Sequence, residues 1–265
     1  MTFHPLHEPV SALLRHVGET VLMRHFRNLS PDQVQMKGVD DPVTIADQES
    51  EALLAERLAE ILPGTLIVGE ESVAADPSVM DRLHGAQCWI IDPIDGTANF
   101  AAGKQPFGIL LALAEAGEVV AGWIFDPVSG RLCHAYAGHG AWIDDMPVIA
   151  RESGRLPPVA AISTMFVDPA DRDALIKTAS SHYQLVDIPR CAAEQYPRLA
   201  LGINDITLFE RTLPWDHAAG ILFINEAGGK AARRDGSPYR ITDGRKGLIA
   251  AASPRLWEEA ASIFA

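Results

Sequence analysis

Apolar positions in the first quarter of the chain predict two helices. Over residues 9–28 they recur every three or four positions, the spacing of an amphipathic helix, and Pro9 falls in its first turn, where proline is tolerated. A second predicted helix has Asp47 near its positive end and four leucines and Ile61 on one face. This helix is expected to stop at Pro63-Gly64, since proline and glycine are both poor at continuing a helix.

Two short apolar runs, Leu66–Val68 and Cys88–Ile91, have the continuous pattern of buried strands. Each run leads directly into acidic residues. Carboxylates at the ends of buried strands point to a site.

The rest of the chain changes character near residues 151–158. Between Gly108 and Ile143, apolar runs alternate with turn sequences, which predicts an antiparallel meander. Beyond the change, strands near 159–162, 206–209 and 248–251 are expected to alternate with helices near 169–180, 192–201, 216–227 and 254–264. The chain is therefore predicted to be a mixed α+β protein of the α/β class, a single domain over 1–265 with possible subdomains 1–150 and 151–265.

Composition and charge restrict the class of function. The chain has 265 residues, 48% of them hydrophobic, which excludes a disordered or fibrous protein. Lys and Arg total 22 against 35 Asp and Glu, a net charge of −13 that disfavours binding to nucleic acid or to a membrane surface. A small phosphorylated substrate would also be repelled unless bound cations reverse the local sign, so the acidity directs attention to metal sites.

The cysteines and the first residues of the chain indicate where in the cell the protein is expected. The three cysteines are far apart and show no C-x-x-C spacing, which fits neither a disulfide framework nor a zinc cage. The start of the chain has no basic region followed by an apolar run, and no stretch reaches the length of a membrane span. A cytoplasmic protein without a membrane anchor is expected.

The stretch from Trp89 to Phe100 carries the most chemical information. Asp92 and Asp95 lie three positions apart across a proline turn, close enough for both carboxylates to reach one pair of hard cations. Together with the carbonyl of Ile94 they suit Mg²⁺, and the N–H groups of Gly96 and Thr97 can meet an anion. A plain Asx turn with a tight glycine corner is the alternative explanation of this spacing.

Three further segments extend this pattern. Gly69-Glu70-Glu71-Ser72 closes the first apolar run, Trp215-Asp216 opens a predicted helix, and Lys37 precedes the stretch from Asp41 to Asp47. With the D-P-I-D-G-T string, these segments resemble the inositol monophosphatase family of magnesium-dependent, lithium-sensitive phosphatases, from Lys37 to Gly229. The resemblance implies a layered α-β-α-β-α sandwich, two or three Mg²⁺ ions, inhibition by lithium and a homodimer.

The resemblance also assigns roles to individual residues. It implies Glu70, Asp92 and the carbonyl of Ile94 as ligands of a first metal, and Asp92, Asp95 and Asp216 as ligands of a second. Thr97 and Asp47 are implied to orient the attacking water, with Glu70 as base. Asp47 is also a candidate helix cap. The residues implied to contact substrate are Asp95, Gly96, Thr97, Ala193 and Glu210.

Other residues are expected to be structural. Glu71 is expected to point away from the ligands and into solvent, because neighbouring residues on an extended segment face opposite sides. His4 and His7 are expected in a frayed tail, and His217 as a packed residue of a helix. No histidine shows metal-ligand spacing. Cys191 is expected to be a small buried hydrophobic residue.

The segments expected near the substrate depart from the family pattern. Arg190 to Tyr196 stands where the family carries a Gly-Ser/Thr-Ala-Ala segment, and Glu210 is displaced by one residue and followed by Arg211. Glu194 and Glu210 are expected to accept hydrogen bonds from sugar hydroxyls. Arg190 and Arg211 either recognise a second anionic group of the substrate or pair with solvent and neighbouring acids.

The function that follows is a Mg²⁺-dependent phosphomonoesterase acting on a small polyol or sugar phosphate, with an activated water as nucleophile. The alternatives within the same superfamily are a 3′-phosphonucleotide phosphatase and a fructose-bisphosphate phosphatase. A regulatory or interaction protein with a vestigial site is the alternative outside the enzymes, and the complete set of acidic residues favours the enzyme.

Overall fold

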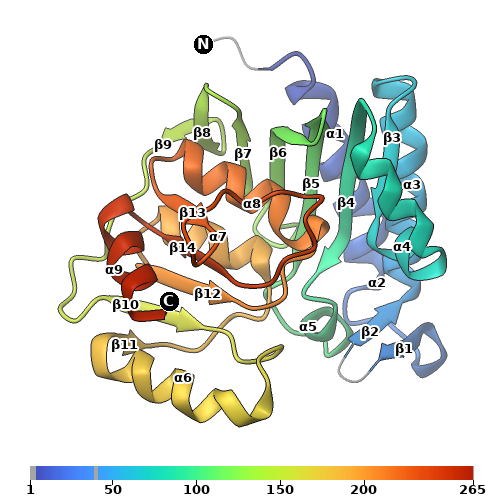
Figure 1. The fold of residues 1–265 in the computed structure, drawn as a ribbon. Coiled ribbons are helices and arrows are strands. Elements are labelled where there is room, and N and C mark those ends of the chain that lie inside the picture. The colour runs from blue at the N-terminus through green and yellow to red at the C-terminus, as the bar shows by residue number, and fades with distance from the viewer. Residues whose placement is uncertain (1–3, 39–40, 265) are drawn as a thin grey trace.

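The protein is built from alternating layers of helices and sheets, as seen in Figure 1. The computed structural model describes residues 4–38 and 41–264. One layer is a seven-stranded sheet in which β3 and β4 are parallel and all other neighbours antiparallel. In spatial order its strands are β3 (Leu66–Gly69), β4 (Gln87–Asp95), β5 (Gly108–Glu115), β6 (Glu118–Phe125), β7 (Leu132–Tyr136), β8 (Gly140–Ile143) and β9 (Met146–Val148).

The second layer of strands is a five-stranded mixed sheet. Its order is β11 (Gln184–Leu185), β10 (Val159–Ile162), β12 (Ile206–Phe209), β14 (Leu248–Ala251) and β13 (Lys230–Ala232). The first three strands are parallel to one another, and β14 is antiparallel to both of its neighbours. A separate antiparallel pair, β1 (Val34–Gly38) and β2 (Asp41–Thr44), precedes both sheets in the chain.

Helices form the other three layers. Against the outer face of the large sheet pack α1 (His7–Val17) and α3 (Ile45–Ile61), with a π-helical turn (Gly18–Leu22) and α2 (Met23–His25) continuing α1. Between the sheets lie α7 (Ala192–Ala200) and α8 (Pro214–Glu226), and the far face of the small sheet is covered by α6 (Pro169–His182) and α9 (Pro254–Phe264). Shorter helices are α4 (Glu70–Ala75), α5 (Thr97–Ala101) and 3₁₀ segments at Pro31–Gln33 and Pro77–His84.

The hydrophobic pattern explains why the sheets are covered on both faces. Along β5, Ile109, Leu111 and Leu113 pack with α1 and α3, while Leu110 and Ala112 pack with α7 and α8. Successive side chains of a strand point to opposite faces, so a continuous apolar run needs a helical layer on each side. The buried residues form three clusters: one between the large sheet and α1 and α3, one that joins both sheets through α7 and α8, and one between the small sheet and α6 and α9.

The layered α-β-α-β-α architecture predicted from the sequence is confirmed. The large sheet ends at Val148 and the small sheet begins at Val159, on either side of the predicted joint. The helices α7 and α8 nevertheless pack against both sheets, so the two subdomains stay a prediction. Within the described residues, the helices all lack the length and apolar content that a membrane crossing requires.

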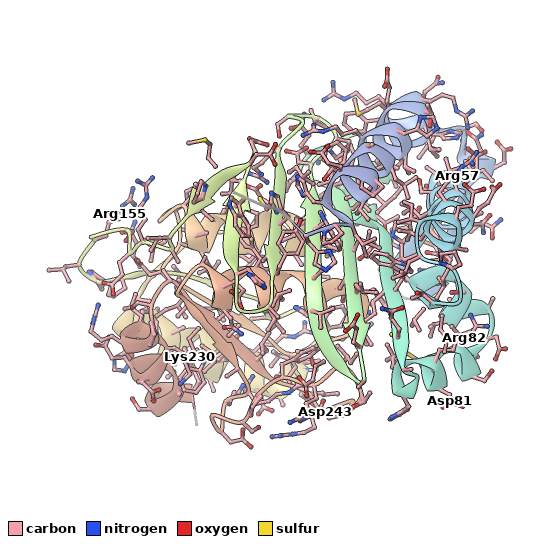
Figure 2. All side chains as sticks on the ribbon, turned by 90° about the horizontal axis from the view of Figure 1, so that it is seen from above. Arg57, Asp81, Arg82, Arg155, Lys230 and Asp243 are labelled. Atoms are coloured by element: carbon pink, nitrogen blue, oxygen red, sulfur yellow. The ribbon has the colours of Figure 1, made fainter. Side chains whose placement is uncertain are left out.

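Charged side chains cover the outside of the molecule. Figure 2 shows Arg57, Arg82 and Arg155 at the periphery, and all three are exposed. Surface ion pairs such as Arg57 with Glu60, at 2.9 Å, contribute little to folding because water and salt screen them. The buried acidic residues are a different case.

Candidate metal centre

Three acidic residues meet where the parallel strands β3 and β4 end. Gly69 pairs with Ile91 in the sheet register, so Glu70, the first residue of α4, lies beside Asp92. Asp216 enters from the first turn of α8. One carboxylate oxygen from each of Glu70, Asp92 and Asp216 lies within 4.8 Å of the other two. The structure thus brings together three of the predicted ligands from segments far apart in the sequence.

A bulge in β4 sets the orientation of the two aspartates. The pairing of β4 with β5 shifts between Asp92 and Asp95, where one extra residue interrupts the ladder. The N–H of Ile94 donates to Asp92 Oδ1 at 3.1 Å, and the N–H of Ala193 donates to Asp95 Oδ2 at 2.6 Å. The Asx turn, given above as the alternative explanation of this spacing, is therefore present, and it holds Asp92 beside the other acidic residues.

The turn after Asp95 requires glycine. Gly96 has a φ of 86°, in the left-handed region, and a Cβ there would lie 3.0 Å from the carbonyl oxygen of Pro106. This turn leads directly into α5, whose first residue is Thr97. The hydroxyl of Thr97 lies 2.7 Å from the carbonyl oxygen of Ile94 and 3.2 Å from Asp47 Oδ1. Its single proton therefore has two acceptors.

Asp47 contacts both Thr44 at the start of its own helix and Thr97 at the candidate site. It is the third residue of α3 and is 1% exposed. Its Oδ2 accepts hydrogen bonds from both the N–H and the hydroxyl of Thr44, each at 2.7 Å, in a capping box. Its Oδ1 faces Thr97. Capping the helix and meeting Thr97 are thus compatible.

A cavity of about 710 Å³ opens beside these carboxylates. It is lined on one side by the predicted ligands Glu70, Asp92, Asp95 and Asp216. Its lining also includes Phe166, Arg172, Arg190, Gln195 and Glu210 from the small-sheet half of the chain, and Arg211, which lies 3.6 Å from Asp216. The cavity therefore combines an acidic end with a mixed polar end.

Burial and mutual repulsion raise the pKa of several of these acids. Burial raises the pKa of Asp95 to about 6 and that of Asp47 to about 7, against partly offsetting hydrogen bonds. The pKa of Asp92 is well above its usual range because of burial and the charges of its acidic neighbours. Each of these carboxylates is costly to ionise here without a cation nearby.

The donor set fits hard divalent cations. The converging groups are carboxylate oxygens, a ligand type that Mg²⁺ prefers. Lys37 Nζ lies 2.7 Å from Glu70 Oε1 and 2.9 Å from Glu71 Oε1, so one positive charge already sits at the edge of the cluster. Burial lowers the pKa of Lys37, but the two glutamates outweigh this and raise it.

Millimolar Mg²⁺ is expected to raise the melting temperature, and more at about pH 8 than at about pH 5. Asp47 and Asp95 have a higher pKa in the folded protein than in the unfolded chain, so between about pH 4 and 7 the folded state holds more protons. Their contribution to the stability of the metal-free protein therefore falls as the pH rises. Bound cations would offset this loss of stability. Melting curves recorded with chelator and with Mg²⁺ at each pH test this prediction. If the curves with chelator and with Mg²⁺ are the same at both pH values, the prediction is wrong.

Several residues lie elsewhere than the sequence suggested. Ala193 is 2% exposed behind the cavity wall, with its N–H bound to Asp95, while Ala192 lines the cavity. Glu194 pairs with Arg131 at 2.6 Å and with Arg198 at 2.8 Å and is not among the residues that line the cavity, so its expected contact with sugar hydroxyls stays a prediction.

Glu71 and His7 also differ from expectation. Glu71 is half-buried and pairs with Lys37 because α4 begins at Glu70, so the segment is helical where an extended chain was expected. His7 is buried at the start of α1, 3% exposed, where a frayed tail was expected. His217 and Cys191 are buried as predicted, and the three cysteines are free.

Two residues of the site were missed. Glu51 lies one helical turn after Asp47 and accepts the N–H groups of Glu71 and Ser72 at 2.7 and 2.8 Å, which fixes the start of α4. The spacing of four residues from Asp47 was the available signal. Gln195 lines the cavity, 2% exposed, and its side-chain amide makes no hydrogen bond within the described residues.

The layered fold and the acidic cavity define the class as a globular α/β protein with a candidate divalent-cation site. The inositol monophosphatase family profile matches residues 4–265. The inositol-1-monophosphatase of Bacillus subtilis is 31% identical over 209 residues, 77% of each chain. The fructose-1,6-bisphosphatase/inositol-1-monophosphatase of Thermotoga maritima is 31% identical over 82% of this chain and 80% of that protein.

A solved structure agrees with these sequence relationships. The extragenic suppressor protein suhB from Bartonella henselae superposes with a TM-score of 0.83 at 26% identity, covering 98% of both chains. The chain belongs to the inositol monophosphatase family.

Proposed function

We propose that this protein is a Mg²⁺-dependent phosphomonoesterase acting on a small polyol or sugar phosphate, such as inositol 1-phosphate. The observation that carries the proposal is the convergence of Glu70, Asp92 and Asp216 beside a cavity large enough for such a ligand. A metabolite phosphate approaching this acidic end would be repelled unless cations were bound there. The family supports phosphatase chemistry at this place.

Two or three cations are proposed to bind among these oxygens. Glu70, Asp92 and the carbonyl of Ile94 would hold one, and Asp92, Asp95 and Asp216 another. When bound, Mg²⁺ supplies positive charge that offsets the charge of the phosphate and lowers the pKa of a water molecule beside it. The N–H groups of Gly96 and Thr97 are proposed to donate to the phosphate oxygens.

Thr97 and Asp47 are proposed to orient the attacking water. If the Thr97 hydroxyl donates its proton to Asp47, its lone pairs can accept a hydrogen bond from the water, so that a water lone pair faces the phosphorus. Asp47 is buried, which shields its carboxylate from bulk solvent, while Thr97 lines the cavity. Glu70 is proposed to take the proton that the water loses as it attacks.

The polar end of the cavity is proposed to receive the alcohol part of the substrate. Glu210 lines it, and its Oε2 lies 2.7 Å from the guanidinium of Arg234. The other carboxylate oxygen is then left to accept a hydrogen bond from a sugar hydroxyl. Gln195 offers a buried amide on the same side.

A sugar bisphosphate is a second candidate substrate, favoured by the arginines Arg172, Arg190 and Arg211 in the cavity wall. Arg211 lies 3.6 Å from Asp216 and 4.0 Å from the ring centre of Phe166. Its contact with Asp216 fits the alternative given above, in which Arg211 pairs with a neighbouring acid. If it also reads a second anion, Arg211→Ala should reduce kcat/KM about 10- to 100-fold more for fructose 1,6-bisphosphate than for inositol 1-phosphate. Arg155→Ala, at an exposed site, is the control. Equal losses on both substrates would remove the bisphosphate candidate.

The alternative of a regulatory protein with a vestigial site is disfavoured by the complete acidic set. A protein that had lost the activity would be expected to lack at least one of Glu70, Asp92 and Asp216. All three are present and converge. A homodimer, lithium inhibition and the absence of nucleic-acid binding remain predictions from the sequence.

Phosphate release from a panel of monoesters tests the proposed function. The panel includes inositol 1-phosphate, sugar phosphates, fructose 1,6-bisphosphate and a 3′-phosphonucleotide, each with Mg²⁺ and with chelator. Release that requires Mg²⁺ and is greatest for a polyol or sugar phosphate is expected, with inhibition by lithium. Release of phosphate from none of them, or release unaffected by chelator, would contradict the proposal.

A further inference from the structure

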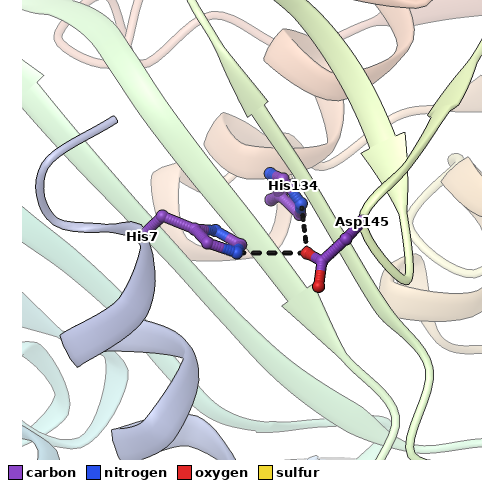
Figure 3. Close-up of side chains that lie close together, drawn as sticks. All are labelled: His7, His134 and Asp145. Carbon is purple, nitrogen blue, oxygen red and sulfur yellow. Dashed lines mark hydrogen bonds and ion pairs between the residues drawn. The ribbon is translucent and has the colours of Figure 1, made fainter. Parts of the chain in front are cut away.

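A second cluster of potential metal ligands lies on the other side of the large sheet. His7 is the first residue of α1, His134 lies in β7, and Asp145 lies in the turn between β8 and β9. Figure 3 shows the two imidazole rings and the carboxylate turned toward one another. The neighbours of His134 in β7, Cys133 and Ala135, belong to the core between the sheets. Since side chains alternate along a strand, His134 faces α1, away from the cavity.

The distances suit a tetrahedral metal ion. Asp145 Oδ1 lies 3.1 Å from His7 Nε2 and 3.3 Å from His134 Nε2. One ligand atom from each of the three residues lies within 4.8 Å of the other two. Zinc bonds of about 2.0–2.1 Å at tetrahedral angles separate neighbouring ligand atoms by about 3.3 Å. Two of the three separations in the cluster are therefore close to the spacing that a bound zinc ion would impose.

Surrounding groups hold both rings in place. The hydroxyl of Tyr136 lies 2.8 Å from His7 Nδ1, so Nδ1 can donate to it and leave the Nε2 lone pair facing Asp145. Ligating histidines are commonly held in this way through their second nitrogen. His134 is fully buried and stacks on Trp142, with ring centres 5.2 Å apart and planes at 8°.

The third ligand keeps the site open to solvent. Asp144 and Asp145 have φ values of 48° and 61°, as in the two-residue turn of a tight hairpin, and this fixes the position of Asp145. The side chain of Asp145 is 60% exposed. A metal ion can therefore enter from solvent and keep water in its remaining position.

We propose that His7, His134 and Asp145 form a site for a transition-metal cation, Zn²⁺ foremost, that is separate from the carboxylate centre. Two imidazoles and one carboxylate suit Zn²⁺, whereas Mg²⁺ prefers oxygen ligands alone. The ion would tie the start of α1 to the hairpin of β8 and β9. This proposal is independent of the phosphatase activity, because none of the three residues lines the cavity.

Calorimetric titration with Zn²⁺ in saturating Mg²⁺ tests the proposal, since Mg²⁺ then occupies the carboxylate centre. One Zn²⁺ per chain is expected to bind, and zinc X-ray absorption should show two imidazole nitrogens. His7→Gln and Asp145→Asn should each weaken this binding about tenfold or more. His139→Gln, in the exposed turn between β7 and β8, is the matched histidine control and should leave it unchanged.

Melting curves provide the second readout. Zn²⁺ should raise the melting temperature of the wild type and of Asp92→Asn, but much less that of Asp145→Asn, whose exposed side chain leaves the core intact. Absence of Zn²⁺ binding in Mg²⁺ would overturn the proposal. Binding that survives both His7→Gln and Asp145→Asn but disappears in Asp92→Asn would overturn it as well, by placing the zinc in the carboxylate centre.

Discussion

Asp92→Asn is expected to lower Mg²⁺-dependent phosphate release by at least about 10³-fold while the protein remains folded. Asparagine keeps the size of the side chain but removes the negative charge of the one residue proposed to bind both cations. A loss of about 4 kcal/mol of charge stabilisation in the transition state corresponds to this factor. Steady-state phosphate release by the purified variant measures it.

The same substitution has an opposite expected effect on stability without metal. Burial and neighbouring acids hold the pKa of Asp92 well above its usual range, so its charge opposes folding when no cation is bound. In chelator, Asp92→Asn should therefore melt at or above the wild-type temperature. Asp168→Asn, at the exposed cap of α6, is the control and should keep full activity, since asparagine caps as well as aspartate. Near wild-type turnover in Asp92→Asn would refute the metal assignment.

Thr97→Val should lower kcat by about 10² to 10⁴-fold with little change in Mg²⁺ affinity. Valine has nearly the same volume but lacks the hydroxyl that lies 3.2 Å from Asp47 and is proposed to orient the water. The carboxylates of the centre are all retained. Measurement of kcat as a function of Mg²⁺ concentration separates the two quantities.

Thr97→Ser is the matched control for that prediction. Serine keeps the hydroxyl and should recover most of kcat. A parallel fall of Mg²⁺ affinity and kcat in Thr97→Val would instead make Thr97 a metal ligand or a purely structural residue.

The architecture follows from the hydrophobic pattern because the decisive signals are local. The runs at Leu66–Val68 and Cys88–Ile91 form the parallel strands β3 and β4, whose shared end gathers Glu70 and Asp92. The alternation of turns and apolar runs after Gly108 forms the meander of β5 to β8. Each of these elements is specified by residues close to it in sequence.

What the sequence pattern missed depends on element boundaries or on distant partners. Glu71 was expected in solvent because an extended segment turns a side chain by about 180° per residue. A helix that begins at Glu70 turns it by about 100° instead, toward Lys37. His7 is buried and contacts Tyr136 and Asp145, residues that no local pattern links to it. The pairing of Glu194 with Arg198, by contrast, has the four-residue spacing of neighbours on a helix, so the sequence itself contained the signal for it.

The most direct test of the metal centre is a crystal structure of the protein soaked in Mn²⁺, with anomalous scattering used to locate the ions. At least one anomalous peak is expected within about 2.5 Å of carboxylate oxygens of both Glu70 and Asp92, with Lys37 displaced from Glu70. A cavity that shows no peak near Glu70, Asp92 or Asp216 in Mn²⁺ would contradict the account.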